Sequence, residues 1–227
     1  MGRCEGGGEA VTLRIAIDGP SGAGKSTLAR RLASHLDLPY IDTGAMYRAV
    51  GLEATRRGCV SAQELTDMVS ELDLAVVSDP SDFRVLLAGL DVTGELRSTD
   101  VSMRASEVAQ VPAVRSWLVE RQRAIASDGA VLEGRDIGSE VLPDAELKLF
   151  ITADESVRIQ RRAVQLGDGC EATLAREIRE RDRRDSQRKA SPLVVPEGAV
   201  VIDTGHDNED GSFARILEAL DQALKTR

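Results

Sequence analysis

The nine residues GPSGAGKST, at positions 19–27, match the spacing G-x-x-x-x-G-K-[ST]. The apolar run LRIAI (13–17) precedes them, and residues 25–36 follow with leucines at helical spacing. Glycines in such a turn let successive backbone N–H groups point inward, beside the positive end of the next helix. The stretch therefore predicts a strand, a phosphate-binding loop and a helix, in that order. The residues expected to bind the nucleotide are Gly19, Pro20, Ser21, Gly22, Ala23, Gly24, Lys25, Ser26 and Thr27.

Two side chains of this loop carry its expected chemistry. Lys25 is placed to reach the β- and γ-phosphates of a nucleotide, and the hydroxyl of Ser26 to bind Mg²⁺. No lysine belongs to an N/T-K-x-D tetrapeptide, which argues against a GTP-dependent switch. Motor and transporter ATPases usually carry four apolar residues before an acid, which AVLEG (130–134) matches only approximately. A small-molecule kinase would need a second, cationic site for its phosphate acceptor.

Strand-like and helix-like patterns alternate along the chain, which predicts an α/β protein with a central parallel sheet. Compact apolar runs at 130–134 and 147–151 are typical of buried parallel strands. Short strand-like runs at 74–79, 83–89 and 90–96 predict a small antiparallel insert. The expected helices cover residues 25–36, 45–57, 61–72, 98–110, 113–126, 154–166 and 171–188.

The composition argues against several classes of protein. A formal net charge of −9 disfavours nucleic-acid or membrane partners, which prefer basic faces. Cys4, Cys59 and Cys170 are scattered and odd in number, so we expect neither a zinc site nor a disulfide framework. This use of cysteine favours a cytoplasmic location. No apolar stretch approaches the ~20 residues that span a bilayer. Residues 1–12 lack the apolar run of a signal peptide, and we expect a disordered tail there.

Arginines recur beside glycines and acids at four places, which predicts a site for a second anion. These places are DTGAMYR (42–48), PAVR (112–115), EGRDIG (133–138) and the charged segment 171–188. The arginine fork can bind phosphate through two hydrogen bonds and keeps its charge. Arg135 and Asp136 follow a predicted strand, at the sheet edge where α/β proteins bind ligands.

A simpler interpretation exists for two of these places. Residues 42–44 could serve only to cap the next helix. In the segment 171–188, the pairs Glu177–Arg181 and Arg181–Asp185 have the i,i+4 spacing of a solvated, ion-paired helix face. The residues alone leave both interpretations open.

Five segments together resemble the bacterial-type cytidylate kinases in order and spacing. They are IAIDGPSGAGKSTLARRLA (15–33), DTGAMYRAV (42–50), VPAVRSWLVERQR (111–123), VLEGRDIGSEVLPDAELKLFITA (131–153) and EIRERDRRDSQRKASPL (177–193). The resemblance spans about residues 13–205 and implies ATP-dependent phosphorylation of CMP or dCMP with Mg²⁺, in pyrimidine metabolism. It also implies a three-layer α/β/α P-loop NTPase fold with a small nucleotide-binding insert and a mobile lid.

The resemblance also implies a division of the chain and a state of assembly. The core would comprise residues 13–60, 111–165 and 190–227, with the insert at about 61–110 and the lid at about 166–189. We expect a monomer whose partners are ATP and CMP or dCMP, with no nucleic acid and no membrane.

Side chains outside the phosphate-binding loop take their implied roles from the same resemblance. They are Arg48, Arg135 and Arg188 for the acceptor phosphate, Ser106, Arg115 and Asp136 for cytosine, Arg181 and Asp185 for the sugar, Arg184 for charge neutralisation by the lid, and Thr43 as a further substrate contact. The expected catalytic set is Lys25, Arg135, Arg181, Arg184 and Arg188. No general base is expected, because the phosphate of CMP is largely ionised near neutral pH.

Two other functions are compatible with the loop. One is a kinase for another acceptor, such as UMP, AMP, shikimate or dephospho-coenzyme A, and the implied cytosine-reading set argues against it. The other is a regulatory module that hydrolyses ATP slowly without an acceptor, and the clustered arginines argue against that.

Overall fold

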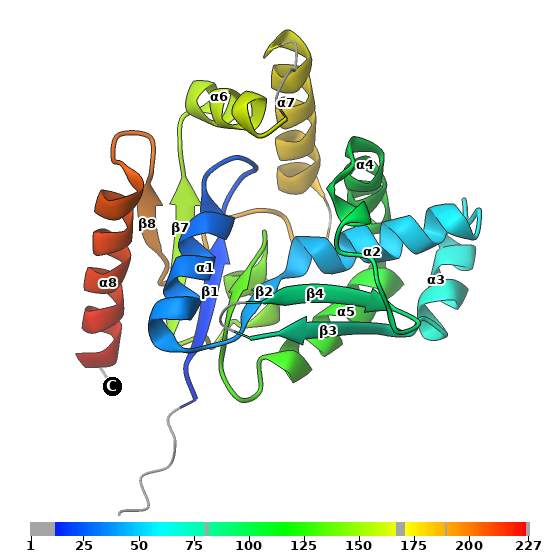
Figure 1. Cartoon of the computed structure of the whole chain (residues 1–227), viewed down its shortest axis with the longest axis horizontal. Coiled ribbons are helices and arrows are strands. Elements are labelled where there is room, and N and C mark those ends of the chain that lie inside the picture. Colours follow the sequence, from blue (N-terminus) through cyan, green and yellow to red (C-terminus); the bar gives the residue numbers. More distant parts are fainter. Residues whose placement is uncertain (1–11, 80–81, 167–170, 189, 226–227) are drawn as a thin grey trace, which may run out of the picture.

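The computed structural model describes residues 12–79, 82–166, 171–188 and 190–225. Its centre is a parallel five-stranded sheet in the order β2-β6-β1-β7-β8 (Figure 1). The predicted α/β class and central parallel sheet are therefore confirmed. The strands are β1 (Arg14–Asp18), β2 (Tyr40–Asp42), β6 (Ala130–Glu133), β7 (Leu147–Thr152) and β8 (Val200–Asp203).

Helices cover both faces of this sheet and form a three-layer α/β/α arrangement (Figure 1). The pair α1 and α8 packs on one face, and α2 and α5 pack on the other. The helices are α1 (Lys25–Leu36), α2 (Thr43–Arg56), α3 (Ala62–Ser70), α4 (Thr99–Val108), α5 (Pro112–Ile125), α6 (Glu155–Leu166), α7 (Glu171–Gln187) and α8 (Glu209–Lys225).

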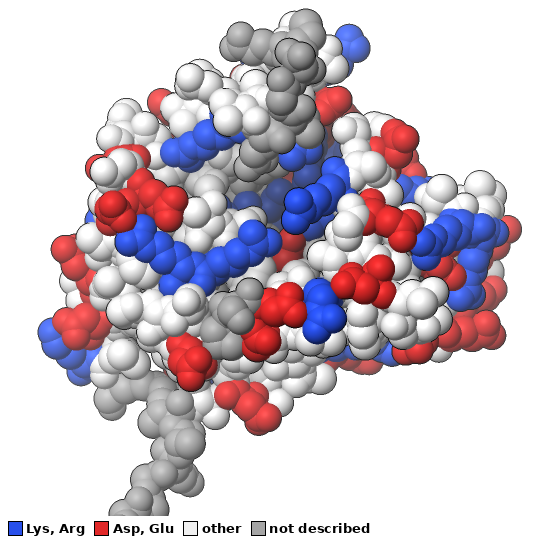
Figure 2. Space-filling view, viewed as in Figure 1, with Lys and Arg blue, Asp and Glu red and all other residues white. Residues whose placement is uncertain are grey.

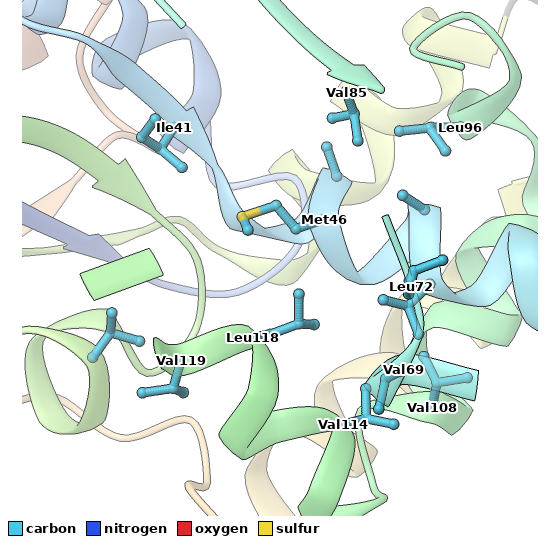
Figure 3. Close-up of a cluster of buried hydrophobic side chains, with 14 of the residues drawn as sticks. Ile41, Met46, Val69, Leu72, Val85, Leu96, Val108, Val114, Leu118 and Val119 are labelled. Atoms are coloured by element: carbon cyan, nitrogen blue, oxygen red, sulfur yellow. The ribbon is translucent and has the colours of Figure 1, made fainter. Parts of the chain in front are cut away.

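Strand β1 is buried on both faces, which explains why its sequence is apolar without alternation. Ile15 and Ile17 pack into the core beneath α1 and α8, and Ala16 faces the core beneath α2 and α5. In the second of these cores, Met46 of α2 lies near Leu118 of α5 (Figure 3). The two cores fix the sheet, and so fix the position of the loop that follows β1.

Local signals set several helix boundaries. Asp42 caps α2, because its Oδ1 accepts a hydrogen bond of 2.9 Å from the backbone N–H of Ala45. Ser61 and Glu64 form the capping box of α3 that their spacing predicts. Pro112 is the first residue of α5, where its missing N–H costs nothing because the first N–H groups of a helix have no partner within the helix.

Three further strands form a small antiparallel sheet, as predicted. Its third strand is much shorter than the expected run 90–96, and residues 95–97 form a 3₁₀ turn instead. Asp91 and Thr93 cause this difference: the Asp91 carboxylate accepts from the Thr93 N–H at 2.9 Å, and the Thr93 hydroxyl accepts from the Val85 N–H at 2.9 Å. The strands are β3 (Leu74–Ser78), β4 (Phe83–Leu87) and β5 (Leu90–Asp91).

Helices α6 and α7 lie beyond the carboxyl ends of the strands (Figure 1). The segment expected to act as a lid, 166–189, corresponds mainly to α7. Within the described ranges, no helix is both long enough and apolar enough to cross a bilayer. Some sequence predictions fall on positions outside the described residues, namely the tail residues 1–11, Cys4, Cys170, residues 167–170 and residue 189.

Candidate active site

The phosphate-binding loop, residues 19–27, leaves β1 at the carboxyl end of the sheet and leads directly into α1. Gly19 has no room for a side chain: its φ is +145°, and a Cβ atom would lie 1.9 Å from the carbonyl oxygen of Ile151. Gly24, with φ +88°, immediately precedes the first helical residue. The unpaired N–H groups of the first turn of α1 are therefore directed to the loop, as an anion-binding turn requires.

The loop borders a cavity of about 640 Å³, which we call the main cavity. The molecule is hollowed on the face shown in Figure 2, and Lys and Arg side chains gather around and inside the hollow. The structure thus brings together side chains from the loop, α2, α4, the segment after β6, and α7. The sequence-predicted residues that line the main cavity are Ser21, Gly22, Gly24, Lys25, Ser26, Thr27, Thr43, Arg48, Ser106, Arg135, Asp136, Arg181, Asp185 and Arg188.

Lys25 is nearly buried at the floor of this cavity, with 6% of its surface exposed. Its Nζ donates a hydrogen bond of 2.7 Å to the carbonyl oxygen of Pro20. Burial and, next, the nearby guanidinium of Arg135 lower the pKa of Lys25 to about 7, while Glu133 opposes this shift. The ammonium group is thus poorly compensated in the ligand-free fold, which favours the approach of an anion.

Glu133 is the buried carboxylate at the end of β6, beside the phosphate-binding loop. Burial raises its pKa, and the charge of Asp42 raises it further. The hydroxyl of Tyr40 donates a hydrogen bond to this carboxylate, and the hydroxyl of Ser26 is close enough to lower its pKa. The hydroxyl of Thr43 donates to the backbone carbonyl oxygen of Glu133 at 2.7 Å, which ties the start of α2 to β6.

Two of the predicted phosphate-binding arginines are held in the cavity wall by carboxylates. Arg48 reaches Asp42 with Nη2 at 2.8 Å, and Arg135 reaches Asp185 with Nε at 2.8 Å. Residues 42–44 therefore do more than cap α2, because Asp42 also orients a cationic side chain. Such pairing fixes each guanidinium before a ligand arrives, and Nη1 of Arg135 makes a further hydrogen bond of 3.1 Å to the carbonyl oxygen of Gly134.

The third arginine belongs to a buried network around Asp136. This third arginine is Arg188, whose Nη2 donates a hydrogen bond of 3.0 Å to Oδ1 of Asp136. The other carboxylate oxygen of Asp136, Oδ2, accepts a hydrogen bond from Nη2 of Arg115. Arg115 is 4% exposed, and its guanidinium lies 5.7 Å from the centre of the Tyr47 ring. Unlike Asp136, Arg115 is not among the residues that line the main cavity, so in this structure it contacts Asp136 and does not reach the cavity where cytosine was expected to bind.

Helix α7 is not simply a solvated, charged helix. Asp185 is buried and pairs with Arg135 rather than with Arg181 at i−4. Arg181 faces the main cavity, and its buried Nε has no hydrogen-bond partner. Burial, reinforced by Arg135, lowers the pKa of Arg181 to about 10. The ion-paired-face interpretation is therefore wrong for Arg181 and Asp185.

Arg184 lies apart from the other predicted catalytic residues. Its Nε donates to Glu180 at 2.8 Å, one turn earlier on α7. It lines a second cavity of about 110 Å³ between α4 and α7 instead of the main cavity. Gly19, Pro20 and Ala23 are also absent from the lining of the main cavity, and they contribute the backbone of the loop.

Comparison with known proteins places this site in a family. The sequence model described as cytidylate kinase matches residues 15–222. The chain belongs to the cytidylate kinase family. The cytidylate kinase of Caldanaerobacter subterraneus subsp. tengcongensis is 43% identical over 222 residues, which cover 95% of this chain and 97% of that protein. The resemblance carried by the five sequence segments is confirmed.

Two further comparisons concern the length and the fold of this member of the cytidylate kinase family. The bifunctional pantoate ligase/cytidylate kinase of Synechococcus sp. (strain JA-3-3Ab) is 49% identical over 221 residues, which cover 93% of this chain but 41% of that protein. The chain thus spans about two fifths of that relative. The crystal structure of an uncharacterized protein from Eubacterium ventriosum superposes with a TM-score of 0.55 at 18% identity, covering 93% of this chain and 99% of that one. This likeness concerns the fold alone.

Two arginines of α6, which the motifs shared with the cytidylate kinase family do not include, also lie close to the site. Arg158 is 7% exposed and joins three elements: its Nη1 donates to the Ser21 carbonyl oxygen at 3.1 Å and to Asp182 of α7 at 2.5 Å. Arg161 donates to the Thr204 hydroxyl at 2.8 Å and lines the main cavity. The repeated arginines of α6 were a signal, but one indistinguishable from a solvated face without the tertiary packing.

Proposed function

We propose that this member of the cytidylate kinase family transfers the γ-phosphoryl group of ATP to CMP or dCMP, giving ADP and CDP or dCDP. The observation that carries the proposal is the meeting of Arg48, Arg135 and Arg188 in one cavity with Lys25 of the loop. In a chain of net charge −9, this concentration of cations is a local feature built for anions. A monophosphate held by the arginines would face a triphosphate held by the loop.

The donor side fits a complex of ATP with Mg²⁺. Ser26 and Glu133 offer oxygen atoms beside the loop, and Mg²⁺ binds oxygen ligands while keeping phosphate oxygens and waters. Among the described residues, no group of three or more His, Cys, Asp or Glu side chains could hold a metal by itself. This donor set suits an ion held largely by the nucleotide, where it would offset charge on the β- and γ-phosphates.

The protein's part in the reaction is positioning and charge compensation. Lys25 binds the β- and γ-phosphates, and the arginines bring the acceptor phosphate into line. Arg181 faces the space between them with a buried, unpartnered Nε, and contributes positive charge to the migrating phosphoryl group. Because the acceptor phosphate is already ionised near neutral pH, Asp136 serves recognition rather than proton removal.

Closure of α7 would exclude water from the reacting phosphates. Arg158 supports this proposal, because it connects α7 to the phosphate-binding loop through Asp182 and Ser21. We assign the lid to residues 166–189 and the nucleotide-binding insert to 61–110, and we expect the kinase to act as a monomer in the cytoplasm.

A panel of acceptors tests the proposed function directly. ADP release would be measured in a coupled assay with ATP and Mg²⁺ and with CMP, dCMP, UMP, AMP or no acceptor. We expect CMP or dCMP to give a kcat/KM at least about tenfold above UMP and AMP, as hydrogen-bond recognition of a base allows. A preference for AMP or UMP would assign another acceptor. Equal ADP release with and without acceptor would indicate a nucleotide hydrolase.

Base recognition depends on Asp136, and we expect Asp136→Asn to lower the ratio of kcat/KM for CMP over UMP by about tenfold or more. The neutral amide cannot accept hydrogen bonds from the ligand and from Arg115 and Arg188 in the same way as the carboxylate. Steady-state kinetics with both nucleotides provides the ratio. Thermal unfolding reports separately on the cost of leaving two buried arginines without their counter-ion.

Asp144→Asn is the matched control, since Asp144 is exposed and forms an ion pair with Arg14 at the surface. It should leave both the ratio and the melting temperature close to wild type. If Asp136→Asn lowered stability but kept the CMP/UMP ratio, Asp136 would be a structural residue and not a base-reading one.

A further inference from the structure

The last residue of β1 is a buried carboxylate to which the proposed reaction gives no role. Asp18 has no exposed surface and lies directly before Gly19 of the phosphate-binding loop. Its Oδ1 accepts a hydrogen bond of 2.8 Å from the backbone N–H of Ile137, and its Oδ2 accepts one of 2.8 Å from the N–H of Gly138. Both partners belong to the segment that follows β6.

Hydrogen bonds to β1 flank Arg135 and Asp136, the two residues of that segment proposed to bind the acceptor. On its N-terminal side, the N–H of Gly134 donates to the carbonyl oxygen of Ile17 at 2.9 Å. Arg135 and Asp136 therefore lie between one backbone bond and the two bonds to Asp18, all made by the last two residues of β1. We call the segment 134–138 the acceptor segment. Its position is defined relative to the strand that carries the phosphate-binding loop.

The chemistry of the contact requires a carboxylate and a close approach. A carboxylate offers two accepting oxygens, whereas an amide of the same shape offers one oxygen and an NH₂ group that would oppose an N–H. Burying such a charge is costly, and burial raises the pKa of Asp18 to about 6. The approach is tight on the other side too: a Cβ atom on Gly138 would lie 3.3 Å from Asp18 Oδ2 and 3.0 Å from Pro196 Cγ.

We propose that Asp18 is a positioning residue that holds Arg135 and Asp136 at a fixed place relative to the phosphate-binding loop, and so aligns the acceptor with the donor. This inference rests on the proposed function. Asp18 acts through the backbone of the acceptor segment and touches neither substrate. Its loss should therefore affect the acceptor and the transfer step more than the binding of ATP, on which Asp18 acts through its charge near Lys25.

Asp18→Asn tests this assignment. We expect the KM for CMP to rise at least tenfold and kcat to fall, while the dissociation constant of ATP, measured by calorimetry without acceptor, changes less than threefold. Arg135 keeps its Asp185 partner in this variant, so the effect reports on displacement of the segment. An equal weakening of ATP and CMP binding, or unchanged kinetics, would overturn the proposal.

Two further variants separate positioning from a general loss of stability. Ile216→Val removes one methyl group from a fully buried site on α8, away from the acceptor segment, and should lower the melting temperature without changing the KM for CMP. Gly138→Ala keeps the Asp18 charge but places a Cβ atom 3.3 Å from Asp18 Oδ2 and 3.0 Å from Pro196 Cγ, so the segment or these neighbours must shift by a few tenths of an ångström. We expect it to reproduce the acceptor-side loss, and this variant decides the question if Asp18→Asn does not fold.

The experiment also distinguishes this inference from the proposed function. If the wild-type protein turned over no CMP or dCMP, the proposed function would fail, whatever Asp18 does. If the wild type phosphorylated CMP but Asp18→Asn (or Gly138→Ala, where Asp18→Asn does not fold) retained its KM and kcat, the positioning role alone would fail.

Discussion

Replacement of Lys25 by alanine is expected to lower kcat/KM by roughly 10³-fold or more, because a positioned cation on the migrating phosphoryl group is among the largest contributions to such reactions. The same change should not destabilise the fold. Burial and the neighbouring Arg135 lower the pKa of Lys25 to about 7, so its charge is unfavourable in the ligand-free protein. We therefore expect a melting temperature equal to or above that of the wild type.

The measurement combines steady-state kinetics with CMP and thermal unfolding without ligand. Lys225→Ala is the matched control: it removes the same side chain at an exposed position on α8, where Lys225 forms an ion pair with Asp221. That variant should retain full activity. Substantial turnover by Lys25→Ala would show that the loop binds nucleotide without using this ammonium group in the transfer.

The phosphate-binding loop shows how much of this site could be predicted from sequence. Its glycines and the leucines that follow are local signals, and the predicted helix 25–36 has the bounds of α1. The position of the acceptor segment is equally predictable from the sequence, because an apolar run followed by EGRDIG places Arg135 and Asp136 at the end of a strand. Parallel strands then bring both segments to one edge without further information.

What could not be predicted depends on packing between distant segments. Whether Asp185 faces solvent or the cavity is decided by Arg135, fifty residues away in sequence, and helical spacing alone favoured a surface pair. The short β5 has a similar cause. The Thr93 hydroxyl accepts the hydrogen bond of the Val85 N–H, in place of a backbone carbonyl oxygen of a longer strand. No sequence pattern or spacing singles out Asp18. Its proposed role depends on the hydrogen bonds that its carboxylate accepts from two backbone N–H groups distant in sequence.

Arg188→Ala is the second change with a large expected effect, a loss of about 10²- to 10³-fold in kcat/KM. Arg188 lines the main cavity and also donates to Asp136 at 3.0 Å, so its removal withdraws positive charge from the acceptor phosphate and loosens a base-reading carboxylate. Arg183→Ala controls for the loss of a guanidinium from the same region, because Arg183 is exposed and pairs with Glu180 on α7. It should remain near wild type.

A double-mutant cycle with Asp136→Asn separates these two effects of Arg188. If Arg188 acts partly by orienting Asp136, the double variant should lose less than the sum of the single losses in transition-state free energy, with a coupling of about 1–3 kcal/mol. Arg188→Lys keeps the charge but not the fork, and should recover part of kcat while the CMP/UMP ratio stays low. Additive losses with an unchanged ratio would mean that Arg188 contacts the phosphate alone. The orientation of Asp136 would then depend on Arg115, its other buried partner.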